Sequence, residues 1–292
     1  MNGVSTSGGG VRAALSYCVQ QVRTYDYHHY LCLLHLPPLV RKAAFALRAF
    51  NIETAKAMDA SSNPPVGLMR LLWWQEVVDK IFSGKLVEHP VAQALSSVIG
   101  EQRISKHWLK RSVEARINDA RREPGEAPET IKEIEKYAED TQSTILYMIL
   151  QAGGIRTATA DHAASHIGKA DGLLLLLKSL PYHLNRAGRV SYMPAEVARK
   201  HGILVTGQGR SEILLEPTEQ FSEAVFDVAS VANAHLKKAR ELYSSVPAEA
   251  LRCCCRRVQF NVFDSRLSRG VMGVSPLWFQ LKLNWHAWRK SY

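Results

Sequence analysis

The chain has 292 residues, 46% of them hydrophobic, which is enough to bury a sizeable core in one large domain or two ordinary ones. No apolar run approaches the roughly 18 residues that span a bilayer, which argues against an integral membrane protein. The formal net charge is +10, but the basic residues are scattered without a nucleic-acid-binding pattern, which argues against an RNA- or DNA-binding module.

Residues 1–11 are expected to form either a disordered Gly/Ser tail or part of a targeting segment. Arg12 and Arg23 are the charged residues among the first 25, and no acid precedes Asp26. A basic start that also contains serine is typical of organelle transit peptides.

Apolar residues recur at helical spacing along most of the chain, with Pro and Gly between the runs. Strand-like alternation is scarce. The pattern predicts an all-α fold, with helices at about 11–36, 40–60, 68–82, 104–122, 131–152 and 223–246.

The second predicted helix carries an unusual polar end. Residues 46–53 read ALRAFNIE and residues 55–59 read AKAMD, so that Asp59 is the one acid among the last five. We expect Glu53 to pair with Lys56 on the helix surface.

Two tryptophans lie side by side in the third predicted helix, where Trp73 and Trp74 precede Glu76. Neighbouring side chains on a helix point about 100° apart. We therefore expect one indole in the core and the other against a neighbouring helix, in a structural role. In the next predicted helix, Arg116 is expected either to form a salt bridge with Asp119, which its spacing allows, or to face a bound anion such as a diphosphate.

The stretch from residue 166 to residue 202 begins as an apolar helix that we expect to end at Pro181, because proline removes a backbone hydrogen bond. Tyr182 and His183 follow. His183 is expected either to bond the last helix carbonyls or to contact a partner. A basic turn then leads through residues 188–194, GRVSYMP, which include Arg189 and Pro194.

The C-terminal part is rich in cysteine and tryptophan. The cysteines at 253–255 are adjacent and lack the Cys-x-x-Cys spacing of a zinc site, and the odd total of five indicates a reducing compartment. Trp278, Trp285 and Trp288 share one face of a predicted basic helix at 276–290. That face either packs on the chain's own domain or contacts a membrane or a partner.

Together these motifs resemble the squalene/phytoene synthase family. The family's Asp-Asp-x-x-Asp signature is similar to residues 55–59, its Asp-x-x-x-Asp helix to 179–183, and its Gly-Arg-Val-Tyr-Leu-Pro element to 188–194. The resemblance implies a single-domain isoprenoid-synthase-type helical bundle around a central cavity over residues 12–292. It also implies that one helix of the family layout is missing near 251–257.

The family's aspartates hold Mg²⁺, which holds a prenyl diphosphate. Their positions here are occupied by Ala55, Lys56, Asp59, Ser179 and His183. Mg²⁺ needs carboxylate and phosphate oxygens, and a lysine repels it. The resemblance therefore implies no catalytic residue, no metal site and no cofactor.

Residues 180–183, LPYH, are similar to one branch of the family, the mitochondrial factors needed to assemble respiratory complex I. The resemblance implies a non-catalytic assembly protein on the matrix side of the inner membrane, with complex I subunits or other assembly factors as partners and no nucleic acid. The alternatives are a prenyl diphosphate condensing transferase and an isoprenoid-binding protein. Positions that identify the family or are candidates for partner contact are Trp73, Trp74, Glu76, Arg116, Pro181, Tyr182, Arg189 and Pro194.

Overall fold

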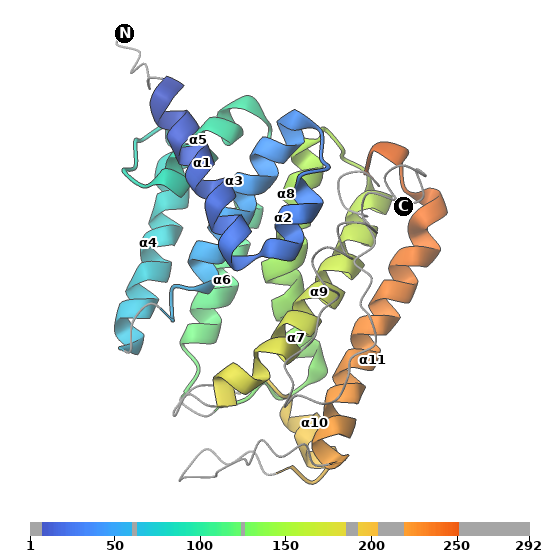
Figure 1. The fold of residues 1–292 in the computed structure, drawn as a ribbon. Coiled ribbons are helices and arrows are strands. Elements are labelled where there is room, and N and C mark those ends of the chain that lie inside the picture. Colours follow the sequence, from blue (N-terminus) through green and yellow to red (C-terminus); the bar gives the residue numbers. More distant parts are fainter. Residues whose placement is uncertain (1–7, 60–62, 124–125, 185–191, 204–218, 251–292) are drawn as a thin grey trace.

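The computed structural model describes residues 8–59, 63–123, 126–184, 192–203 and 219–250 (Figure 1). All regular structure within these ranges is helical, which confirms the predicted all-α class. The helices are α1 (Gly8–Tyr25), α2 (Tyr27–Leu33), α3 (Pro38–Ala55), α4 (Pro64–Phe82), α5 (Pro90–Glu101), α6 (Lys106–Ala120), α7 (Ile131–Ala138), the π-helical η1 (Glu139–Ser143), α8 (Thr144–Ala152), α9 (Ala158–Leu184), α10 (Ala195–Lys200), α11 (Glu219–Glu241) and the 3₁₀-helical η2 (Leu242–Ser245).

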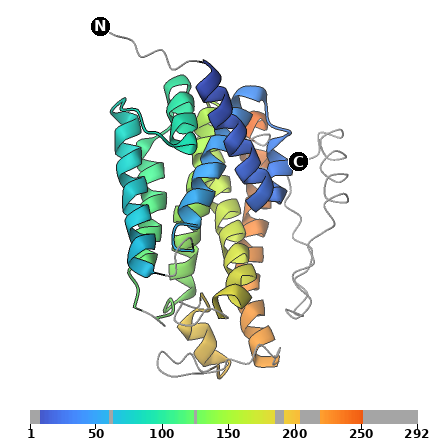
Figure 2. The same ribbon diagram turned by 60° about the vertical axis from the view of Figure 1, so that its left-hand side comes forward.

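Helix α3 lies at the centre of the bundle. Every residue from Ala43 to Ile52 is buried, so the helix has no solvent face along this stretch. A helix that is covered on all sides needs neighbours all round, and α1, α5, α6 and α8 supply them. The outer helices are α4 at one edge and α11 at the opposite edge (Figures 1 and 2).

The first predicted helix is two helices. The expectation of one helix over 11–36 is wrong, because the chain breaks at Asp26, whose φ of −144° is not helical. The Asp26 carboxylate lies 2.7 Å from Nδ1 of His29 in the first turn of α2. The helix α1 also begins at Gly8, inside the expected tail of residues 1–11.

Helix α5 was not predicted from the sequence. It begins at Pro90, where the missing N–H of proline costs nothing because the first helical N–H groups lack intrahelical partners. Its apolar residues Val91, Leu95 and Val98 are buried against the α1–α3 side of the core.

The predicted helix at 131–152 contains a π-helical turn, η1, which widens it between α7 and α8. All four residues from Asp140 to Ser143 are buried here. Helix α9 passes very close to this turn. A Cβ on Gly168 would lie 2.5 Å from Cα of Ser143, and one on Gly172 would lie 2.4 Å from Cβ of Ala138. The two glycines allow this contact because they have no side chain.

Helix α9 continues through Pro181 to Leu184, so the predicted end at Pro181 is wrong. Pro181 lies in the last turn of a long helix, where the loss of one backbone hydrogen bond does not stop the remaining turn. Helix α11 then packs along α9 on the outside of the bundle (Figure 1). Among the described residues, no helix combines the length and the hydropathy needed to cross a bilayer.

Candidate functional site

A layer of buried polar side chains crosses the centre of the bundle, where α3, α6 and η1 meet. Two of its members are arginines that are almost fully buried, Arg48 at 3% exposure and Arg116 at 6%. Buried charged groups are rare unless they are paired. This layer is therefore the part of the described core that is least like the apolar interior of a purely structural helical bundle.

Arg48 joins three helical segments. Its Nη1 donates to Oε1 of Gln142 in η1 at 3.2 Å and lies 3.8 Å from Oδ2 of Asp26. Burial would raise the pKa of Asp26, but His29 and Arg48 outweigh it and hold that pKa well below its usual value. Asp26 is therefore a carboxylate at neutral pH, and it fixes the start of α2 to the centre of α3.

Arg116 on α6 bonds to neutral groups. Its Nη2 donates to Oδ1 of Asn51 at 2.8 Å, and its Nη1 donates to Oγ of Ser112 at 2.9 Å. Burial lowers the pKa of Arg116, and the nearby phenols and the Asp119 carboxyl partly offset this. The salt bridge to Asp119 that the sequence suggested is replaced in the structure by the bonds to Asn51 and Ser112.

Asp119 instead faces Tyr192, whose hydroxyl donates to Oδ2 at 2.5 Å, and Arg122, whose Nε lies 3.6 Å from Oδ1. Burial raises the pKa of Asp119 above its usual value, and burial likewise raises the pKa of Tyr137 to about 12. Tyr137 and Tyr192 hold their rings 6.0 Å apart. Among the described residues, three buried atoms here have no hydrogen-bond partner: Nε of Arg116, Oδ1 of Asp119 and Nη1 of Arg122.

The second acid of η1, Asp140, has two cationic partners. Nε of Arg111 donates to Oδ1 of Asp140 at 2.6 Å, and Nζ of Lys136 donates to Oδ2 at 2.5 Å. Glu139 lies 3.2 Å from Nζ of Lys169 on α9. Burial would raise the pKa of Glu139, but Lys169 and Arg111 hold it below its usual value. Each carboxylate of η1 is thus already neutralised by the chain's own cations.

The positions that resemble the family's first aspartate signature lie at the end of α3. Ala55 is exposed, and Asp59 lies in the turn that follows the helix. Nζ of Lys56 sits over the ring of Tyr25, 3.3 Å from its centroid. The expected pair of Glu53 with Lys56 is not what the structure has, since Glu53 accepts from the Tyr17 hydroxyl at 3.2 Å. One carboxylate beside an ammonium group does not fit Mg²⁺.

The second signature lies on α9. The Ser179 hydroxyl donates a hydrogen bond to the carbonyl of Leu176 at 2.8 Å, within its own helix. The backbone of Pro181, Tyr182 and His183 belongs to α9, but their side chains lie outside the described residues, as does Arg189. Pro194 is buried and precedes α10.

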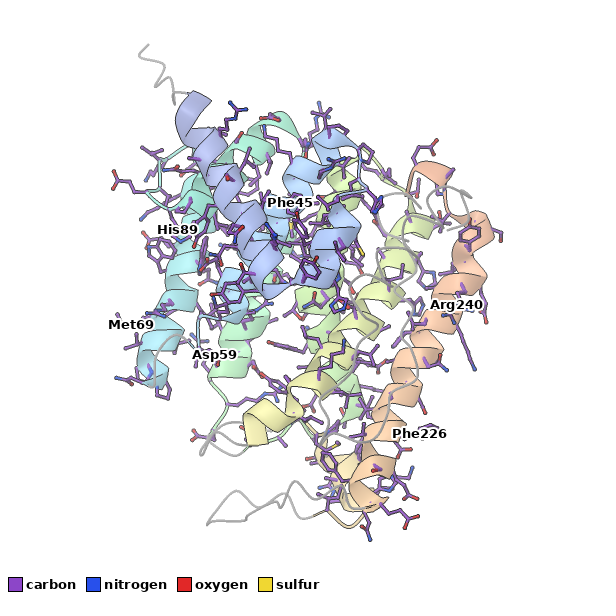
Figure 3. The ribbon with its side chains drawn as sticks, in the orientation of Figure 1. Phe45, Asp59, Met69, His89, Phe226 and Arg240 are labelled. Carbon is purple, nitrogen blue, oxygen red and sulfur yellow. The ribbon has the colours of Figure 1, made fainter. Side chains whose placement is uncertain are left out.

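One tryptophan of the pair on α4 lies in the core, as expected, but the other is exposed instead of packing against a neighbouring helix. Trp74 is 3% exposed, whereas Trp73 is 38% exposed. The buried indole packs edge-on against Phe50, with ring centroids 5.4 Å apart, and against His89 at 5.0 Å. Glu76 is exposed and pairs with Lys80 at 2.8 Å. Figure 3 labels His89, which precedes α5, and Met69, which lies on α4.

Sequence reasoning missed three groups of interactions between helices. They are the Asp26–Arg48 pair, the Asp140 cluster and, away from this centre, a row of histidines on the α11 side of the bundle. Arg48 had a visible signal, because it interrupts an apolar run on a central helix. In the described part of the chain, no three His, Cys, Asp or Glu side chains are placed to hold a metal ion.

Comparison with known proteins agrees with this architecture. The solved structure of a dehydrosqualene synthase superposes with a TM-score of 0.71, covering 97% of this chain and 99% of that one at 19% identity. The squalene synthase HpnC from Alicyclobacillus acidocaldarius gives 0.68 over 99% of this chain and 98% of that one, at 16% identity. At these identities the likeness shows the fold alone, an isoprenoid-synthase fold.

Relatives in sequence are more similar. The rat protein named NADH dehydrogenase (ubiquinone) complex I, assembly factor 6 is 35% identical, over 99% of this chain and 86% of its own length. The human protein of the same name is 34% identical over the same shares. A Drosophila melanogaster homologue is 38% identical over 87% of this chain and 75% of its own. The sequence profile of squalene/phytoene synthase matches residues 22–259, and the chain therefore belongs to the squalene/phytoene synthase family.

Proposed function

We propose that this protein serves the assembly of mitochondrial respiratory complex I. The observation that carries the proposal is the match to the rat and human assembly factors over 99% of this chain. A match of that extent includes the whole helical bundle and the segments that join its helices. It supports a shared role more strongly than a likeness confined to one motif.

We further propose that the protein is not a prenyltransferase. The positions that resemble the metal-binding signatures carry a methyl group, an ammonium group, one carboxylate, a hydroxyl and an imidazole, at Ala55, Lys56, Asp59, Ser179 and His183. Such a set supplies too few hard, negatively charged oxygens for Mg²⁺. The central layer, in contrast, holds two buried arginines whose partners lie within the chain.

The proposal places the protein in mitochondria, on the matrix side and peripheral to the inner membrane. Its partners would be complex I subunits or other assembly factors. A contact of Trp278, Trp285 and Trp288 with the membrane stays a prediction, because these residues lie outside the described ranges. The same holds for the helix expected to be missing near 251–257.

Cells that lack the protein are expected to lose most of their complex I while keeping the other respiratory complexes. The measurement is a native gel of mitochondrial membranes stained for NADH dehydrogenase activity. Re-expression of the wild type should restore the band. Asp59→Asn removes the last carboxylate of the first signature without changing its shape, and it should restore the band equally well. Normal complex I in the deleted cells would contradict the assembly role. If the wild type restores the band and Asp59→Asn does not, the Asp59 carboxylate still has a chemical function.

The purified protein is expected to bind no prenyl diphosphate in a Mg²⁺-dependent way. The measurement is calorimetric titration with a non-hydrolysable farnesyl diphosphate analogue, with and without Mg²⁺. The physical reason is that Lys56 repels the ion and one carboxylate cannot hold it. A tight isotherm that disappears on chelation of Mg²⁺ would contradict the non-catalytic assignment while leaving the assembly role untouched.

A further inference from the structure

A row of three imidazoles and one carboxylate joins three helices on the α11 side of the bundle. His162 and His166 lie one turn apart on α9, His235 lies on α11 and Glu135 lies on α7. Nδ1 of His166 is 2.8 Å from Nδ1 of His235, and its Nε2 is 3.2 Å from Nε2 of His162. Nε2 of His235 is 2.5 Å from Oε1 of Glu135. Each of these three links needs one proton between its two heavy atoms.

The carboxylate fixes where those protons are. Ionised Glu135 can only accept, so Nε2 of His235 carries a proton. A neutral His235 then offers a lone pair at Nδ1, and His166 must donate from its own Nδ1. The remaining nitrogen of His166 is left to accept from His162. All three imidazoles are neutral in this arrangement, and every link is satisfied.

The row can take up one more proton without losing a link. If His235 is protonated, the direction of donation reverses, so that His235 donates to His166 and His166 donates to His162. If His166 is protonated instead, it donates at both nitrogens to its two neighbours. A second proton has no such solution. With His166 and His235 both charged, two N–H groups and two positive charges face each other across the 2.8 Å contact.

The surrounding charges oppose protonation of His166. Lys169 on α9 and Lys238 on α11 act on it together with the imidazoles of His162 and His235. Burial is the largest cause, and with these neighbours it lowers the pKa of His166 from 6.5 to about 4. The lysines keep partners of their own, since Lys169 pairs with Glu139 at 3.2 Å and Lys238 with Glu241 at 3.0 Å. On α7 the negative group that faces the row is Glu135.

The row interrupts an otherwise apolar contact between α9 and α11. On one side of it lie Ala170, Leu173, Val228 and Ala232, and on the other side lie Ala163, Ala164, Leu242 and Val246, which belong to two separate apolar clusters. Because the outer helix α11 packs more on α9 than on any other element, the α9–α11 contact is its main attachment (Figure 2). Separation there would expose buried apolar side chains of both helices.

We propose that this row is an acid-sensitive latch, which holds α11 on α9 while its imidazoles share at most one added proton and releases α11 when two neighbouring imidazoles are charged. Release follows from the 2.8 Å His166–His235 contact, because two charged imidazoles there repel each other across the boundary between α9 and α11. The inference concerns the fold itself and goes beyond the assembly role proposed above.

The sign of the pH dependence follows from the lowered pKa. A histidine whose pKa is lower in the folded chain than in the unfolded one contributes stability that is fully present above its unfolded value. For His166 that contribution is lost as the pH falls from 6.5 towards about 4. The latch is therefore closed at neutral and alkaline pH and opens in acid.

Hydrogen exchange of the full chain, read peptide by peptide at about pH 7.5 and about pH 5, tests the latch. After correction for intrinsic exchange rates, the amides of α11 should lose about tenfold or more of their protection at the lower pH. Those of α6, whose histidine is exposed, should change little. His166→Gln removes the charge that breaks the contact, and it should abolish the difference. His107→Gln is the matched control, because His107 is exposed on α6 and contacts Trp108 instead.

Two results would overturn the latch. The first is equal protection of α11 at both pH values in the wild type. The second is an undiminished loss of protection in His166→Gln. Should that variant fail to fold, His235→Gln serves instead, because it also leaves no two charged imidazoles face to face across the α9–α11 contact.

Discussion

Replacement of Gly168 by alanine is expected to lower the free energy of unfolding by about 3 kcal/mol, although alanine is the better helix former. The added Cβ would lie 2.3 Å from Oγ, 2.5 Å from Cα and 2.5 Å from the backbone nitrogen of Ser143. Two of these atoms belong to the backbone of η1, so a side-chain rotation cannot relieve the contact. Helix α9 would have to move away from η1, and with it the Ser143 hydroxyl would lose its bond to the carbonyl of Ser165.

The same substitution elsewhere should have the opposite sign. Gly100 lies in α5, and a Cβ there would meet no atom within 4 Å. Gly100→Ala should therefore raise the free energy of unfolding by about 0.5 kcal/mol through helix propensity alone. Chemical denaturation followed by circular dichroism measures both variants. A stabilising effect at both positions would mean that α9 does not approach η1 as closely as the structure has it.

Much of the fold could be predicted from the sequence because its helices carry strong apolar periodicity. The all-α class and most of the long helices follow from that periodicity. The burial of only one of Trp73 and Trp74 follows from the 100° between neighbouring side chains on a helix. Helix α5 was missed because its apolar residues are interspersed with serine and glycine over a short stretch. The break at Asp26 was missed because it depends on His29 and on Arg48 from another helix.

The π-helical turn is also beyond sequence reasoning. Residues 139–143 read EDTQS, which is an unremarkable polar segment until Arg111, Lys136 and Lys169 surround it. Lys136 lies one turn before Asp140, but Arg111 and Lys169 come from helices distant in the chain, so that local propensity carries no signal for their contacts. The glycines at 168 and 172 were visible in the sequence, but only the positions of η1 and of the end of α7 explain why both must lack a side chain.

The candidate site, like the fold, could be predicted from the sequence only in part. The replacement of acids by Ala55, Lys56 and Ser179 can be read directly from the sequence, since it needs only the motif positions. The pairing of Arg116 with Asn51, rather than with Asp119, cannot, because Asn51 becomes a neighbour of Arg116 only once α3 and α6 are placed against each other. The row of His162, His166, His235 and Glu135 likewise exists only once α7, α9 and α11 are packed.

Trp74→Ala is expected to lower the free energy of unfolding by about 3–5 kcal/mol, the range for deleting a large aromatic side chain from a core. Trp74 is 3% exposed and fills the space between α4 and α3, where its ring meets Phe50 edge-on at 5.4 Å. The same deletion at the next position should cost only about 1 kcal/mol, because Trp73 is 38% exposed and loses mainly its edge contacts with Trp74 and His89. Thermal and chemical denaturation of the two variants provides the comparison.

Variants of this adjacent pair also distinguish an effect on stability from an effect on partner binding. Trp73 lies on the outside of α4 with Leu72, which is 40% exposed, and Met69, which is 67% exposed and is labelled in Figure 3. On α11, at the opposite edge, Phe226 is 70% exposed and serves as a control for the loss of a surface aromatic side chain. If Trp73→Ala folds but fails to restore complex I, while Phe226→Ala restores it, the outer side of α4 contacts an assembly partner. If both variants restore complex I, the tryptophan pair is a packing element of the family fold and the partner binds elsewhere. Equal destabilisation by Trp73→Ala and Trp74→Ala would contradict the orientation of α4 on which either reading depends.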